Sequence, residues 1–119
     1  MMIFNKLVRD RIPEKIEGNG EKAVVRTLND DEYKLELNKK LLEECNEVIG
    51  AKDSTEIKEE LGDVLEVIRA IAELNNSNLD EIIRVSDAKK EKRGGFDKRI
   101  FLERTYEIDE CEEQEILLN

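Results

Sequence analysis

Two groups of carboxylates at helical spacing are the residues of this sequence best suited to chemistry. Glu44 and Glu47 are three residues apart, and Glu60 and Asp63 repeat that spacing further along the chain. Side chains three or four residues apart project from one face of a helix. If the two helices pack antiparallel, four carboxylates converge, and their repulsion requires protons or a cation nearby. Because all-oxygen ligand sets suit Mg²⁺ or Mn²⁺, the pattern predicts a divalent-metal site.

Glu60 is the most informative of these carboxylates. It precedes Val64, Val67 and Ile71 by four, seven and eleven residues, so it lies in line with apolar positions of its helix. Burying a bare carboxylate is costly, so Glu60 must be paired or metal-bound. The alternative is an acidic face in water, because 30 of the 119 residues are Asp or Glu and pairs at helical spacing also arise by chance.

The composition excludes several other kinds of site and partner. Histidine is absent, which removes His-ligated zinc, Glu-x-x-His di-iron sites and Ser-His-Asp catalysis. Cys45 and Cys111 lack metal-ligand spacing. A net charge of −10 argues against nucleic-acid polymers and anionic membranes as partners. Residues 1–13 contain no apolar run long enough for a signal peptide or membrane helix, so we expect a reduced, cytoplasmic chain.

Helix signals place these residues in an all-α domain. Asn29 and Asn78 are each followed three residues later by Glu, as at helix N-termini. The expected helices run from Pro13 to about Glu17, from Asp30 to about Gly50, from Asp53 or Ser54 to about Leu74, and from Leu79 to about Arg93. Short extended segments are expected near residues 23–28 and 100–106, the second with apolar contacts from Phe96 and Ile100–Leu102. We assign residues 1–104 to one domain and residues 105–119 to an acidic tail, a frayed or loosely docked helix.

The long helices carry broader apolar stripes than one small protomer covers. We therefore expect a four-helix-type core that is completed by dimerisation.

Basic residues flank the domain at two places. Lys89, Lys92 and Arg93 end the last expected helix, and Lys6 and Arg9 lie near the N-terminus. They are candidates for binding phosphate; the alternatives are complementing the helix dipole and forming solvated ion pairs.

The acidic groups also carry a family resemblance. Glu43-Glu44-Cys45-Asn46-Glu47 followed by Glu60-Leu61-Gly62-Asp63 resembles the EExxE…ExxD motif of the all-α nucleoside triphosphate pyrophosphohydrolases. That superfamily includes MazG, the dimeric dUTPases and the phosphoribosyl-ATP pyrophosphohydrolases. The segment from Asn5 to Pro13 resembles the opening of small MazG-like, phosphoribosyl-ATP pyrophosphohydrolase-like proteins. Lys89 and Arg93 with Gly94 and Phe96 resemble the downstream Lys-x-x-x-Arg-Gly-x-Phe, so the resemblance covers roughly residues 3–102.

The resemblance implies a MazG-like helical bundle, a homodimer or homotetramer, that hydrolyses a nucleotide to its monophosphate and pyrophosphate, in a housekeeping role or otherwise. The implied Mg²⁺ ligands, with Mn²⁺ as an alternative ion, are Glu44, Glu47, Glu60 and Asp63. Glu43 would bind a second ion or orient water. Lys89 and Arg93 would hold phosphates, with Lys92, Lys6 and Arg9 as further candidates. This chemistry needs no covalent nucleophile, because bound Mg²⁺ offsets the charge that develops on phosphate oxygens.

Three alternatives stay open at the level of the sequence. The substrate could be phosphoribosyl-ATP instead of a nucleoside triphosphate. The same fold could serve as a non-catalytic nucleotide or metal sensor. The acidic residues could also be solvated faces of a purely structural helical adaptor.

Overall fold

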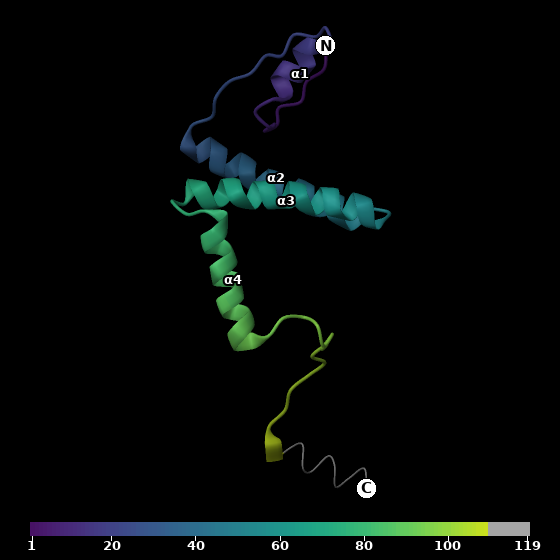
Figure 1. Ribbon diagram of the computed structural model, residues 1–119, viewed down its shortest axis with the longest axis vertical. Helices are drawn as coiled ribbons and strands as arrows, with labels where there is room; N and C mark the ends of the chain where they lie inside the picture. The colour runs from purple at the N-terminus through teal and green to yellow at the C-terminus, as the bar shows by residue number, and fades with distance from the viewer. Residues whose placement is uncertain (110–119) are drawn as a thin grey trace. The chain divides into compact units, whose positions relative to one another are not determined.

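Helices form the regular structure of this chain in a computed structural model that describes residues 1–109. The part of the chain so described contains four complete helices and no strand, which confirms the all-α class. The helices are α1 (Ile12–Gly18), α2 (Asp30–Gly50), α3 (Ser54–Leu74) and α4 (Leu79–Arg93). Figure 1 shows α2 and α3 lying side by side and running in opposite directions. Because only residues 51–53 join them, antiparallel packing is the arrangement such a short connection favours.

The N-terminus of α2 is fixed by the capping residues that the sequence predicts. The Glu32 backbone N–H donates to Asn29 Oδ1 at 2.9 Å, and the Asn29 N–H donates to Glu32 Oε1 at 3.4 Å. Arg26 lies 2.9 Å from the same carboxylate. The hydrogen bond from Arg26, and then that from the Asn29 backbone, lowers the pKa of Glu32. The stabilisation by ionised Glu32 is therefore present above its ordinary pKa and is lost as the pH falls through the lowered value.

The later helices begin and end at similar signals. Asp53 Oδ1 accepts from the Glu56 N–H at the start of α3, and Asn78 Oδ1 accepts from the Glu81 N–H at the start of α4, both at 2.9 Å. Gly94 ends α4 with a φ of +82°, where its N–H donates to the Lys90 carbonyl at 2.7 Å. A residue with a side chain adopts this left-handed conformation less readily, so glycine suits the position.

The core of the described residues is small. Leu37 on α2 and Val67 and Ala72 on α3 are the buried residues, with 3%, 6% and 4% of their surface exposed. Other apolar side chains of the predicted stripes are far less covered; Leu42 on α2 is 69% exposed and Ile49 is 81% exposed. The contact between α2 and α3 thus buries only the inner part of each helix. A broad apolar surface of the helix pair stays exposed.

The chain divides into two compact units, Met1–Ser86 and Asp87–Asn119, and α4 runs across the boundary. In the second unit, residues 100–107 form no strand, and Phe96 and Phe101 are 97% and 85% exposed. The prediction that Phe96 and Ile100–Leu102 make apolar contacts is therefore wrong for the described residues. Residues 23–28 likewise form an irregular connection, not a strand. The predicted tail from residue 110 onward lies outside the described residues, and the domain boundary at residue 104 stays a prediction.

Within residues 1–109, none of the helices combines the length and the hydropathy that a bilayer crossing requires.

The cap of α2 gives a direct test of this local structure. Asn29→Ala removes the acceptor for the Glu32 N–H and should lower the free energy of unfolding by about 1 kcal/mol. Asn38→Ala, at an exposed position in the middle of the same helix, is the matched control and should be neutral or slightly stabilising. Urea denaturation followed by circular dichroism measures both. Equal stabilities for the two variants would contradict the capping role.

Candidate metal centre

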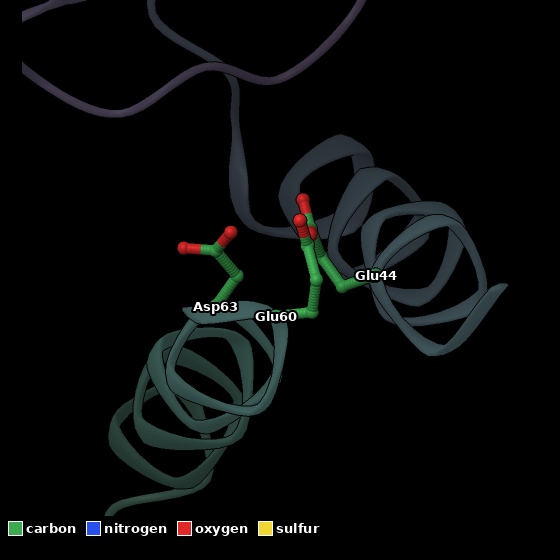
Figure 2. A group of neighbouring side chains, drawn as sticks. All are labelled: Glu44, Glu60 and Asp63. Atoms are coloured by element: carbon green, nitrogen blue, oxygen red, sulfur yellow. The ribbon is translucent and has the colours of Figure 1, made fainter. Parts of the chain in front are cut away.

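Three carboxylates from two helices meet in the first unit. Glu44 extends from α2, and Glu60 and Asp63 extend from α3 (Figure 2). One oxygen from each lies within 4.8 Å of the others, and all three residues are half-buried. Figure 2 shows the carboxylates of Glu44 and Glu60 next to each other, with one Asp63 oxygen directed toward them. We call Glu44, Glu60 and Asp63 the carboxylate triad.

The packing of α2 against α3 explains why these side chains converge. Glu44 follows the buried Leu37 by seven residues, and Glu60 precedes the buried Val67 by seven. Seven residues are close to two helical turns, so each glutamate lies on the line that its helix presents to the other. Asp63 follows Glu60 by three residues and lies at the edge of that line. The packing that buries Leu37 and Val67 thus also positions the triad.

The triad is electrostatically strained without a counter-ion. Partial burial raises the pKa of the Glu60 carboxyl above its ordinary value, and the negative charges of four neighbouring carboxylates raise it further: Asp63, Glu47, Glu44 and Glu59. Both causes favour the neutral form of Glu60. A cation bound among these oxygens would reverse the effect, because it favours the ionised carboxylates.

Two cationic side chains partly neutralise the triad. Arg9 donates from Nη2 to Asp63 Oδ1 at 2.7 Å, and Lys40 Nζ lies 3.7 Å from Glu44 Oε1. Arg9 was a sequence candidate for binding phosphate, and the structure places it against the triad. Sequence reasoning missed Lys40, although it precedes Glu44 by four residues, a spacing typical of helical ion pairs.

The remaining acidic candidates lie outside the triad. Glu47 is exposed, and its charge acts on Glu60, but its oxygens are not within the 4.8 Å group. Glu43 is also exposed and lies 3.3 Å from Lys40 Nζ. Their roles as a fourth ligand and as a water-orienting group stay predictions.

The basic candidates are distributed over both units. Lys6 lies in the first unit, with its Nζ 5.8 Å from the centroid of the Phe4 ring. Lys89, Lys92 and Arg93 are exposed on the part of α4 that belongs to the second unit. Their assignment as phosphate ligands stays a prediction.

The triad has the donor chemistry that a hard divalent cation needs. All three groups offer carboxylate oxygens from two well-formed helices, and Mg²⁺ and Mn²⁺ prefer oxygen ligands. Mg²⁺ commonly binds through a few carboxylates and keeps the rest of its coordination for water and substrate phosphates. The residues present therefore fit the metal that the sequence predicts.

A known family model matches the part of the chain that contains the triad. The family model of the MazG nucleotide pyrophosphohydrolase domain matches residues 33–95, which is more than half of the chain and includes all three triad residues. The chain belongs to this family. The match begins near the N-terminus of α2 and ends just after α4, so the MazG family region contains the triad and the basic end of α4.

A relative and the solved structures add limited detail. A protein of Mycolicibacterium smegmatis (strain ATCC 700084 / mc(2)155), described as uncharacterized, is 54% identical over 46 residues. The match covers 39% of this chain and 47% of that protein, so it spans about half of the relative's length. No solved structure is significantly similar to this chain.

The repulsion within the triad predicts how the metal-free protein responds to substitution. Glu60→Gln removes a negative charge at the centre of the group and should raise the melting temperature at neutral pH. The same change should abolish the further rise that MgCl₂ or MnCl₂ produces in the unaltered protein. Glu59→Gln, an exposed neighbour outside the triad, should leave the metal-induced rise intact. Thermal denaturation with EDTA and with each metal salt measures both effects. An equal metal response in the unaltered protein and in Glu60→Gln would show that Glu60 is not a ligand.

Proposed function

We propose that this MazG-family chain is a Mg²⁺-dependent nucleotide pyrophosphohydrolase. Its substrate would be a nucleoside triphosphate or a related nucleotide, cleaved to the monophosphate and pyrophosphate. The observation that supports this proposal most is the carboxylate triad, because it combines three oxygen donors, an unbalanced negative charge and a position inside the family match. A purely structural role gives no reason to hold three carboxylates at a helix–helix contact.

The triad residues would bind the metal, and Glu47 would supply a fourth oxygen from the next turn of α2. When bound, Mg²⁺ would offset the negative charge that develops on the phosphate oxygens. Glu43 would orient the attacking water or bind a second ion. Lys89 and Arg93 would hold phosphates, with Lys92, Lys6 and Arg9 as further ligands. In the reaction, water adds to the phosphorus of the monophosphate product and pyrophosphate leaves with the electrons of the broken P–O bond.

The proposal is tested by measuring pyrophosphate release from nucleoside triphosphates, deoxynucleoside triphosphates and phosphoribosyl-ATP, with MgCl₂ and with EDTA. We expect metal-dependent release from at least one of these nucleotides. Asp63→Asn should reduce kcat/KM by roughly 100-fold or more, which is about 2.7 kcal/mol of lost transition-state stabilisation. Asp80→Asn, an exposed carboxylate at the start of α4, is the matched control and should retain full activity.

The outcomes of this assay separate the alternatives. Release from phosphoribosyl-ATP alone would identify that nucleotide as the substrate. Metal and nucleotide binding without turnover of any nucleotide would contradict the enzyme and favour a sensor. Full activity of Asp63→Asn would show that the active site lies elsewhere.

We also propose that the protein forms a homodimer through the exposed apolar surface of the α2–α3 pair. The exposed apolar side chains of α2 recur every seven residues and therefore form a line along the helix: Leu35, Leu42 and Ile49. Those at the start of α3 recur every four residues: Ile57, Leu61 and Leu65. With three buried apolar residues in the described core, a second copy would cover surface that the protomer leaves in water.

Sedimentation equilibrium tests the dimer. The unaltered protein should sediment as a dimer, and Leu42→Lys should shift it toward the monomer by placing a charge on this apolar line. Lys39→Gln, an exposed position on the same helix, is the control and should leave the dimer unchanged. A monomeric unaltered protein, or a Leu42→Lys variant as dimeric as the control, would contradict the proposed interface.

A further inference from the structure

A recess beside the triad lies in the N-terminal segment, outside the family match. It has a volume of about 370 Å³, and it is lined by Arg9, Arg11, Ile12, Glu14 and Lys15. This volume falls at the small end of the range for ligand pockets. The recess is open, so a small polar ligand would enter it without a rearrangement of the chain.

Cationic residues outnumber anionic ones around this recess in an otherwise acidic protein, and apolar atoms form most of the surface that faces it. Three of its five residues are cationic and one is anionic, whereas the whole chain has a net charge of −10. Arg11 and Lys15 form no ion pair with any residue in 1–109. Lys34 and Lys58 of the same unit also form no ion pair within residues 1–109, whereas Lys22 and Lys39 lie 3.2 and 3.0 Å from carboxylates close in sequence. The recess therefore holds two cations without an ion pair, Arg11 and Lys15, beside one carboxylate, Glu14.

Arg9 connects this recess to the carboxylate triad. Arg9 is one of the residues that line the recess, and its guanidinium donates to Asp63 Oδ1 at 2.7 Å. A guanidinium has five N–H donors in a planar fork, and Asp63 accepts one of them. The remaining donors are free to bind an anion while the bond to Asp63 is kept. One polyanion would thus contact both the recess and a cation held by the triad.

We propose that this recess, which we call the N-terminal recess, binds the pyrophosphate portion of the nucleotide. The inference rests on the proposed function and adds a second place where phosphates are held. Arg11 and Lys15 would bind phosphate oxygens, since charge-assisted hydrogen bonds to phosphate are among the stronger polar contacts in proteins. Arg9 would contact the same phosphates and act as a positioning residue for Asp63. The N-terminal segment is then a wall of the site.

The test is calorimetric titration of the full chain with inorganic pyrophosphate in the presence of EDTA, so that no metal contributes. The unaltered protein should bind pyrophosphate, and the double variant R11Q/K15Q should bind it at least about tenfold more weakly. The single variants R11Q and K15Q should each show part of this loss. The control is K22Q/K39Q, which removes the same charge from the same unit at exposed positions outside the recess.

Titration with MnCl₂ alone separates this inference from the proposed function. Arg11 and Lys15 do not touch the triad, so R11Q/K15Q should bind Mn²⁺ as the unaltered protein does. Equal pyrophosphate affinity of R11Q/K15Q and K22Q/K39Q, or no binding by the unaltered protein, would overturn the recess assignment and leave metal-dependent turnover untouched. A selective loss in R11Q/K15Q would support the recess even if every nucleotide failed to turn over, a result that would contradict the enzyme alone.

Discussion

The site depends on one electrostatic constraint, the repulsion among three carboxylates held at the contact between α2 and α3. The packing that buries Leu37 and Val67 also places Glu44 and Glu60 against each other, so the protein cannot form its core without bringing these charges together. The raised pKa of Glu60 reflects the free-energy cost of holding these charges close together. Lys40 and Arg9 offset part of it from opposite ends of the triad, and a divalent cation would offset it more completely. Stability and metal binding are therefore coupled through the same helix contact.

Much of this arrangement follows from local sequence signals. Asn29 with Glu32 fixes the start of α2 by two reciprocal hydrogen bonds, which depend only on residues three apart. Glu60 was predictable because it lies in line with Val64, Val67 and Ile71, and Glu44 because it stands three residues before Glu47 on one helix face. Asp63 was predictable as the residue one turn beyond Glu60. Short-range spacing was thus enough to place the helices and to predict a converging set of four carboxylates, of which Glu44, Glu60 and Asp63 lie together.

Interactions between distant segments were not predictable in the same way. The bond from Arg9 to Asp63 joins residues 54 positions apart, and no periodicity links them. The N-terminal recess likewise depends on the folded chain, because it forms where residues 9–11 meet the start of α1. Phe96 and Phe101 look like core residues by type but lie exposed, since apolar character alone does not supply a partner surface. Residue type and spacing predicted four carboxylates that include the triad; which three of them meet, and what surrounds them, required the folded chain.

The most direct test of the central claim is a titration with Mn²⁺ followed by electron paramagnetic resonance, on the unaltered protein and on Glu44→Gln, Glu60→Gln and Asp63→Asn. If the three carboxylates form one metal site, the unaltered protein binds Mn²⁺, Mg²⁺ competes for it, and each substitution weakens the same binding event. Binding of Mn²⁺ that is unchanged in all three variants, or absent from the unaltered protein, would contradict the account.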